Sequence, residues 1–252
     1  MSELLEVNGV SVRFAGLQAL TDVSFSVSPG EIVAFVGPNG AGKTTLFNVM
    51  SGFVTPTSGT IALRGVSIGG NPPSKIAAAG MRRTFQNGGV FGGMTVFENI
   101  LTGLHSSTPS SLFGLAFNLK SARQAEAKAE QSTRALIEQM GLGHIADRFA
   151  KDLSGGQQRM LEIVRTIATA PPVILLDEPA VGLSPTARIQ MADMIRKLAK
   201  ENNAAILLIE HSVELVMSIS DRIVVLNGGK KIADGPPSEI RQNKQVLEAY
   251  LG

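Results

Sequence analysis

Residues 37–44 form a glycine-rich segment whose residue types and spacing suit the binding of phosphate. The segment reads Gly37-Pro38-Asn39-Gly40-Ala41-Gly42-Lys43-Thr44, which matches the pattern G-x-x-x-x-G-K-[ST]. Its glycines let the backbone curl so that successive N–H groups point at phosphate oxygens, beside the positive end of a following helix. Lys43 can reach the β- and γ-phosphates, and the Thr44 hydroxyl can ligate Mg²⁺. We therefore predict a nucleotide site here, with Thr45 as a further contact.

A second set of chemical groups follows the apolar run at residues 173–176, which ends in Asp177 and Glu178. The carboxyl ends of strands are where α/β folds place their ligands. Asp177 can hold Mg²⁺ directly or through water, and Glu178 can polarise an attacking water. Phosphoryl transfer needs little beyond positioning and charge neutralisation, so this division of roles suffices. A strand that ends in two acids is common by itself, but after a phosphate loop it is the expected second half.

Strands and helices must hold these groups in place. Residues 31–36 form a short apolar run suited to a buried strand, and a helix is expected to continue from residue 45. Strand patterns at 4–14, 20–27 and 61–63 predict an antiparallel sheet beside the nucleotide loop. After residue 172, strands at 173–176, 204–209 and 222–226 alternate with helices near 186–200 and 212–218. This alternation predicts an α/β fold with a mainly parallel sheet.

Between residues 95 and 170 the pattern is helical, so we expect an α-helical subdomain inserted into one nucleotide-binding core. The predicted core, with its antiparallel subdomain, covers residues 1–86 and 167–252, and the helical subdomain covers 87–166. Ser121 is predicted to cap an amphipathic helix that stops at Gly141. The charged residues at 126, 128, 130 and 138 are expected to face solvent. The glycine-rich stretch 87–93 is either a hinge into the helical subdomain or an ordinary surface loop.

The composition excludes several classes of protein. A chain of 252 residues with 44% apolar content can bury a sizeable core, and the absence of cysteine excludes disulfides and thiolate metal sites. The first residues show no secretory signal, and no apolar run approaches ~18 residues. We therefore expect any membrane role to come through a partner. A formal net charge of +2, a single tyrosine and no tryptophan do not support nucleic-acid binding.

The segment Leu153-Ser154-Gly155-Gly156-Gln157 lies about 110 residues after Lys43 and about 20 before the acidic strand. At this spacing it resembles the signature of ATP-binding-cassette (ABC) ATPases. Ser154 and the glycine N–H groups at a helix N-terminus can form a second anion site. The resemblance implies that Ser154, Gly155, Gly156 and Gln157 face the ATP of the opposite subunit in a head-to-tail dimer. The alternative for this segment alone is a helix cap that binds no ligand.

Other positions match elements of the ABC family one by one. Gln86 resembles the glutamine that touches Mg²⁺ and water and links the core to the helical insert. His211 resembles the switch histidine that contacts the γ-phosphate, although alone it would suit a structural role at a strand end. Phe14 resembles the aromatic residue that stacks on adenine, with a core phenylalanine as the alternative. One departure is Ser184, where the family usually has Asp or Asn that helps couple the two sites across the dimer.

His105 and His144 match no family element and are expected to be surface or packing residues. The stretches 80–87, 93–100 and 246–252 look like those of the ATP-binding subunits of branched-chain amino acid importers. In that subfamily the signature often reads Leu-Ser-Tyr-Gly-Gln, so Gly155 departs from it towards the general pattern. No segment of domain size follows residue 236, so we expect no C-terminal regulatory domain.

The resemblance implies an ATPase that uses ATP and Mg²⁺ as a peripheral subunit on the cytoplasmic face of the membrane. Two such chains, identical or different, would dock beneath two permease subunits, and an external binding protein would deliver the substrate. The rivals are an ATPase of a lipid or lipopolysaccharide exporter and a non-transport ABC ATPase. The stretch 82–87 favours import, and the chain has neither tandem cassettes nor long coiled coils. A simple phosphate-loop kinase would have no use for residues 153–157.

Overall fold

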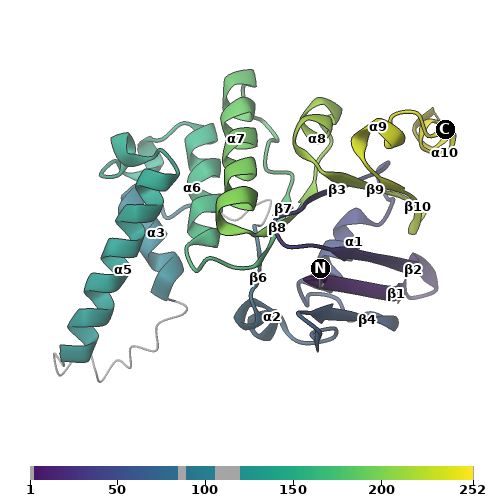
Figure 1. Ribbon diagram of the computed structural model, residues 1–252, viewed down its shortest axis with the longest axis horizontal. Coiled ribbons are helices and arrows are strands. Elements are labelled where there is room, and N and C mark those ends of the chain that lie inside the picture. Colours follow the sequence, from purple (N-terminus) through teal and green to yellow (C-terminus); the bar gives the residue numbers. More distant parts are fainter. Residues whose placement is uncertain (1–2, 85–88, 106–119, 252) are drawn as a thin grey trace. The chain divides into compact units, whose positions relative to one another are not determined.

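The computed structural model describes residues 3–84, 89–105 and 120–251, and its ribbon is drawn in Figure 1. The chain divides into two compact units. The first comprises Met1–Gln86, Pro171–Val181 and Arg188–Gly252, and the second comprises Asn87–Ala170 and Gly182–Ala187. Among the described residues, none of the helices combines the length and the apolar character needed to cross a membrane.

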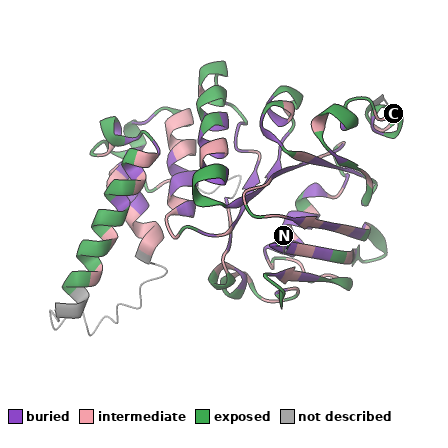
Figure 2. Ribbon diagram, viewed as in Figure 1, coloured by how far each residue is buried: buried purple, intermediate pink, exposed green. Residues whose placement is uncertain are grey.

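The first unit is built on a mainly parallel sheet with the strand order β10-β9-β3-β8-β7-β6. Its strands are β3 (Ile32–Val36), β6 (Met81–Arg83), β7 (Val173–Asp177), β8 (Ala205–Ile209), β9 (Arg222–Asn227) and β10 (Lys230–Gly235). All neighbours pair in parallel except β9 and β10, which are antiparallel. The central strands are buried along nearly their whole length (Figure 2), which explains why they are continuous apolar runs. This confirms the predicted α/β core.

An antiparallel sheet with the strand order β2-β1-β4-β5 accompanies this core, as predicted. Its strands are β1 (Leu5–Phe14), β2 (Leu17–Val27), β4 (Ser58–Leu63) and β5 (Val66–Ser67). Two of them begin three residues earlier than their apolar patterns indicate. Phe14 pairs with Leu17 and Arg13 with Gln18 next to a tight turn, and Ser58 pairs with Ser11. Backbone pairing thus extends the strands into largely exposed positions that apolar alternation does not mark.

Helix α1 (Lys43–Met50) lies between the two sheets in Figure 1, and its apolar side chains belong to the large core cluster with residues of both sheets. Phe35 of β3 lies at the centre of this cluster. Its ring makes edge-to-face contacts with Phe25 at 5.0 Å and with Phe47 at 5.8 Å between centroids. Because side chains alternate along a strand, Val33 and Phe35 face α1 while Ala34 points to the other face of the sheet.

The opposite face of the core sheet is covered by helices from the C-terminal part of the chain. They include α8 (Val213–Ile219), α9 (Pro237–Ile240) and α10 (Lys244–Leu251), whose apolar residues Val216, Ile240 and Val246 pack with Ala34, Ile223 and Val225. Helix α7 (Pro185–Asn202) buries one apolar stripe, and α2 (Pro73–Ala79) precedes β6. The predicted helices near 186–200 and 212–218 are confirmed to within two residues.

The second unit is helical. It contains α3 (Val96–His105), α5 (Lys120–Gln139), α6 (Gly155–Ile167) and the short 3₁₀ turns η1 (Gly143–Ile145) and η2 (Ala150–Asp152), and α3 contacts both α5 and α6. The buried Asn99 side chain accepts from the Phe91 N–H at 2.8 Å and donates to the Phe91 carbonyl at 3.0 Å. This amide therefore fixes the loop that enters α3.

The long helix α5 runs from Lys120 to Gln139, so Ser121 lies inside the helix and the prediction that it is the N-terminal cap is wrong. Its end is as predicted. Gly141 has φ +70°, its N–H donates to the Glu138 carbonyl, and the Leu142 N–H donates to the Ile137 carbonyl. This pair of bonds is a Schellman motif, which requires the left-handed conformation that glycine adopts freely. The charged residues at 126, 128, 130 and 138 are exposed, as expected.

Candidate functional site

A pocket of about 490 Å³ opens at the carboxyl ends of the parallel strands of the first unit. This is the edge where α/β sheets place their ligands. The lining residues come from the β1–β2 hairpin, the phosphate loop, the ends of β7 and β8, and the β9–β10 turn: Phe14, Leu17, Gln18, Ala19, Asn39, Gly40, Ala41, Gly42, Lys43, Thr44, Thr45, Glu178, His211, Gly228 and Gly229. The fold thus gathers most of the predicted site residues of this unit into one cavity.

The phosphate loop depends on backbone conformations that favour glycine. Gly37 has φ +147°, and a Cβ at this position would lie 2.0 Å from the carbonyl oxygen of Leu226 in β9. Gly42 has φ +101° and directly precedes Lys43, the first residue of α1. The loop can therefore lie close against β9 and lead directly into the helix, so that the first N–H groups of α1 face the cavity.

Lys43 is largely buried inside the loop. Its Nζ donates to the carbonyl oxygens of Gly37 at 2.7 Å and of Pro38 at 3.0 Å. Burial lowers the pKa of Lys43 below its ordinary value of 10.5, and the nearby charge of Glu178 partly opposes that shift. An ammonium ion held mainly by neutral carbonyls would gain favourable Coulomb energy from an anion entering the pocket.

Glu178 and His211 meet across the ends of β7 and β8. The Nε2 atom of His211 lies 3.0 Å from Oε1 of Glu178, and the Glu178 N–H donates to the Ile209 carbonyl at 2.9 Å. Glu178 has φ +49°, a left-handed conformation that costs an ordinary residue of order 1 kcal/mol and is concentrated at functional sites. The structure thus pairs the predicted water-polarising acid with the predicted switch histidine.

Glu210 holds these two segments together. Its buried carboxylate accepts from the Ala180 N–H at 2.7 Å and from the His211 N–H at 3.0 Å. The loop after Glu178 and the segment that carries His211 are therefore tied to one side chain. The sequence singled out no role for Glu210, because nothing in its local pattern indicates a contact 30 residues back along the chain.

Asp177 is not among the residues that line the pocket. Its carboxylate is buried at the end of β7, where Oδ2 accepts from Nη2 of Arg83 at 2.8 Å. The Arg83 Nη1 atom also donates to Oδ1 of Asn48 at 2.7 Å and to Oγ of Ser51 at 2.9 Å, both in or next to α1. The predicted metal ligand is thus connected through Arg83 to the helix that follows the phosphate loop.

Phe14 lies at the end of β1 on the rim of the pocket, next to Leu17. Its exposed fraction of 46% excludes the alternative that it is a core phenylalanine. An exposed ring at the mouth of such a pocket can stack on a base, so the position of Phe14 is compatible with the predicted adenine contact.

The signature segment Ser154-Gly155-Gly156-Gln157 belongs to the second unit, where Ser154 caps α6. The Ser154 Oγ atom accepts from the Gln157 N–H at 3.3 Å, and the Ser154 N–H donates to Oε1 of Gln157 at 3.0 Å, which together form a capping box. Ser184 has a similar position before α7, where its hydroxyl accepts from the Ala187 N–H at 3.3 Å. A helix-capping role explains a serine at position 184. Gln86 lies outside the described residues.

Several residues at the site were not anticipated. The β9–β10 turn lines the pocket through Gly228 and Gly229, and a Cβ at Gly229 would lie 2.6 Å from the Ala19 carbonyl. Tyr250 of α10 interacts with the phosphate loop: burial raises the pKa of its phenol, and a hydrogen bond with the Gly37 backbone opposes that rise. Only the paired glycines give a local signal, namely a turn.

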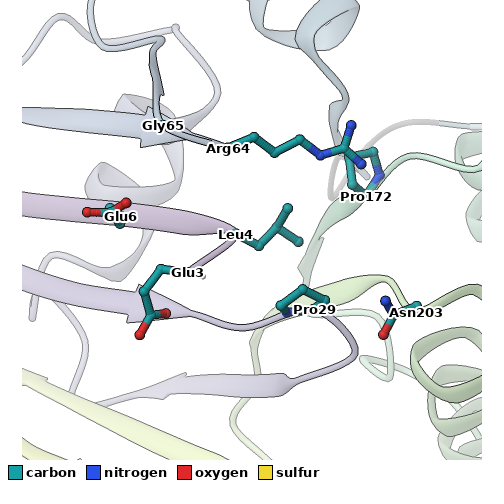
Figure 3. A pocket seen from close by; sticks show the side chains of 8 residues that line it. All are labelled: Glu3, Leu4, Glu6, Pro29, Arg64, Gly65, Pro172 and Asn203. Atoms are coloured by element: carbon teal, nitrogen blue, oxygen red, sulfur yellow. The ribbon is translucent and has the colours of Figure 1, made fainter. Parts of the chain in front are cut away.

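A larger cavity of about 650 Å³ lies at the other end of the same strands (Figure 3). Pro29, Pro172 and Asn203 precede β3, β7 and β8, so this cavity is at the amino ends of the parallel strands, away from the phosphate loop. Figure 3 shows the Arg64 side chain extending across it towards Pro172. The charged side chains that line it are exposed or partly exposed. The smaller pocket, where the glycine loop and buried polar groups converge, is therefore the candidate nucleotide site.

Comparison with known proteins identifies the family of the chain. Residues 20–181 match the family model described as ABC transporter, and residues 230–252 match that of the branched-chain amino acid ATP-binding cassette transporter. The chain belongs to the ABC transporter family, as an ATP-binding subunit that hydrolyses ATP.

The chain is similar to two particular transport proteins over nearly its whole length. It is 45% identical, over 99% of its own length and 98% of theirs, to the high-affinity branched-chain amino acid transport ATP-binding proteins LivG of Escherichia coli and BraF of Pseudomonas aeruginosa. Among solved structures, it resembles a nucleotide-free ATP-binding cassette from an ABC transporter, with 31% identity, a TM-score of 0.84 and full coverage of both chains. A cassette in its ADP conformation gives the same identity and TM-score.

Proposed function

We propose that this protein is the ATP-hydrolysing motor of an importer for branched-chain or closely related amino acids. The proposed substrate class rests on the 45% identity of the chain to LivG and BraF over 98% of their length. The match of residues 230–252 to the branched-chain amino acid family model supports it independently, because this segment lies outside the part that matches the general ABC model. In this proposal the amino acid never contacts the chain, which supplies only the energy of ATP hydrolysis.

ATP binds in the pocket of the first unit. The backbone N–H groups of residues 37–45 hold the phosphates, Lys43 turns from the Gly37 and Pro38 carbonyls to the β- and γ-phosphates, and Phe14 stacks on the adenine. Glu178 polarises the attacking water, and His211 contacts the γ-phosphate. The 3.0 Å contact between His211 and Glu178 supports a joint role for these two side chains.

Mg²⁺ fits two oxygen donors of the first unit, one that lines the pocket and one that lies at the end of β7 outside its lining. The hydroxyl of Thr44 and the carboxylate of Asp177 would hold it, with Gln86 as a third contact. Within the described residues there is no cluster of three or more His, Asp or Glu side chains that could enclose a metal. That agrees with Mg²⁺, which usually takes one or two protein oxygens and completes its shell with phosphates and water. When bound, it neutralises charge on the β- and γ-phosphates.

The working unit is a head-to-tail dimer docked on two permease subunits at the cytoplasmic face of the membrane. In that dimer the capped N-terminus of α6, with Ser154, Gly155, Gly156 and Gln157, faces the ATP of the opposite subunit. The exposure of Ser154 and Gly155 supports this role, because their hydroxyl and N–H groups are accessible to a second chain. An extracytoplasmic binding protein delivers the substrate to the permeases.

The proposal is tested by recovering the assembly from its native membrane. The tagged protein is purified from solubilised membranes and its companions are identified by mass spectrometry, and uptake of radiolabelled leucine is compared between cells with and without the chain. We expect two amino-acid-type permeases, a second cassette and loss of leucine uptake in the deletion strain. Recovery of lipid-export components, or of soluble proteins only, would contradict the proposal.

A further inference from the structure

Arg83 is a buried cation that the function described so far does not use. It is the last residue of β6, and only 7% of its side chain is exposed. Its guanidinium donates to Asp177 in β7 and to Asn48 and Ser51 in or next to α1, and it lies 5.8 Å from the centre of the Phe47 ring. A single side chain therefore connects three elements of the first unit.

The two elements that Arg83 joins to β6 are those that carry the proposed metal ligands. Thr44, Asn48 and Ser51 are spaced at i, i+4 and i+7, so they lie on one face of α1. Arg83 contacts this face one and two turns below Thr44, and its other amino group holds the carboxylate of Asp177. The rigid, forked guanidinium fixes both partners at once, which a lysine ammonium could not do.

We propose that Arg83 is a positioning residue for the metal half of the nucleotide site. It holds the Asp177 carboxylate and the Thr44 face of α1 in a fixed relation, so that the metal meets a prearranged pair of oxygens. Partners that orient metal ligands from outside the coordination shell typically change metal affinity by about ten- to a hundred-fold when they are removed. This inference rests on the proposed assignment of Thr44 and Asp177 to Mg²⁺.

The test compares nucleotide binding with and without metal. The affinity of the full-length protein for a non-hydrolysable ATP analogue is measured by calorimetry in excess Mg²⁺ and in excess EDTA. The Mg²⁺ concentration that gives half-maximal hydrolysis is measured at saturating ATP. For Arg83→Gln we expect this concentration to rise by about ten-fold or more, with little change of affinity in EDTA. Arg83→Lys keeps the charge but not the fork, so we expect a smaller shift in the same direction.

A second variant is needed in case removal of the buried charge of Arg83 prevents folding. Asn48→Ala removes one acceptor of Arg83 and leaves its pair with Asp177 intact, and we expect a several-fold rise in the required Mg²⁺ concentration. Arg222→Gln is the matched control. Arg222 pairs with Glu31 and Asp234 at 2.7 Å in the same unit, outside the pocket. Its loss should lower stability without changing the Mg²⁺ requirement.

The possible results distinguish failure of the positioning role of Arg83 from failure of the proposed function. If the wild-type protein needs no Mg²⁺ for hydrolysis, the proposed metal site fails and the inference fails with it. If wild-type hydrolysis needs Mg²⁺ and the Arg83 and Asn48 variants need the same concentration, only the inference is overturned. A lower requirement in Arg83→Gln would also overturn it, because Arg83 would then compete with the metal instead of preparing its site.

Discussion

Replacing Glu178 by glutamine separates hydrolysis from binding. The glutamine has nearly the same shape, the backbone bond from residue 178 to the Ile209 carbonyl remains, and the new amide can still hydrogen-bond to His211. The free energy of unfolding should therefore change by no more than about 1 kcal/mol. The amide cannot accept a proton, so a positioned general base is lost. That loss should lower the rate of hydrolysis about 10²- to 10⁴-fold, or raise the barrier by about 3–5 kcal/mol.

Binding should respond in the opposite way. Glu178 lies near enough to Lys43 for its charge to affect the pKa of that lysine, so it also lies near the proposed position of the phosphates. Removing its negative charge takes away a repulsion, and the affinity for ATP should stay equal or increase. The variant should accumulate an ATP-bound dimer because the complex is no longer resolved by hydrolysis.

The assays are phosphate release at saturating MgATP, calorimetric titration with ATP, and size-exclusion chromatography with and without ATP. Glu201→Gln is the control, because it makes the same chemical change at an exposed position of α7 whose ion pair with Lys197 is long, at 3.9 Å. It should behave as wild type. Wild-type turnover in the Glu178→Gln variant would refute the assignment of Glu178 as the water-polarising residue, and lost ATP binding would refute the claim that its charge opposes the phosphates.

Three further predictions concern Lys43, Phe14 and Phe35. Burial holds the pKa of Lys43 below 10.5, so the buried charge of Lys43 lowers the stability of the folded protein at neutral pH. This destabilisation disappears as the pH rises through the lowered pKa and Lys43 loses its proton. The affinity for ATP needs the charged ammonium group, so it should fall in the same alkaline range. Lys43→Ala should bind ATP weakly at all pH values in binding titrations. If that variant lost ATP affinity at alkaline pH as much as the wild type does, the role of Lys43 in phosphate binding would be contradicted. Phe14→Ala should weaken ATP binding by about 1–3 kcal/mol if the ring stacks on the base. Phe53→Ala is the control, because Phe53 is 54% exposed and lies outside the pocket, and it should leave ATP binding unchanged. Equal effects of the two substitutions in binding titrations would exclude stacking. Phe35→Leu should lower the free energy of unfolding by roughly 1–3 kcal/mol, because two edge-to-face contacts of about 0.5–1.5 kcal/mol each are lost, and urea denaturation that detects no change would contradict this estimate.

The parts of the site that the sequence predicts are those whose chemistry is local. The phosphate loop, its strand and its helix form one continuous segment, and Asp177 and Glu178 directly follow an apolar run. Contacts between distant segments give no such signal. Arg83 is 94 residues from Asp177, and Tyr250 contacts Gly37 from the other end of the chain. Such pairs depend on the order of strands in the sheet, which apolar periodicity does not encode.

The exposure of Phe14 and the first residues of β2 and β4 also depend on contacts that local sequence patterns do not show. The residue type and position of Phe14 matched a family element, but its exposure depends on the hairpin turn at residues 15 and 16, where both residues have positive φ. The early starts of β2 and β4 depend on backbone hydrogen bonds to β1, and the side chains there are polar or exposed. The domain limits at 86 and 167 and the roles of the site residues stay predictions.

The position of β3 between β8 and β9 has a consequence for how the chain matures on the ribosome. Residues 32–36 emerge early, yet both of their sheet neighbours lie beyond residue 204. During synthesis one face of β3 can be covered at once by Phe25 and Phe47, which are close to it in sequence. Its other face and its two edges must wait for most of the chain. Since Gly37 lies directly against the backbone of Leu226 in β9, the phosphate loop reaches its final packing only after β9 has joined the sheet, late in the order of synthesis.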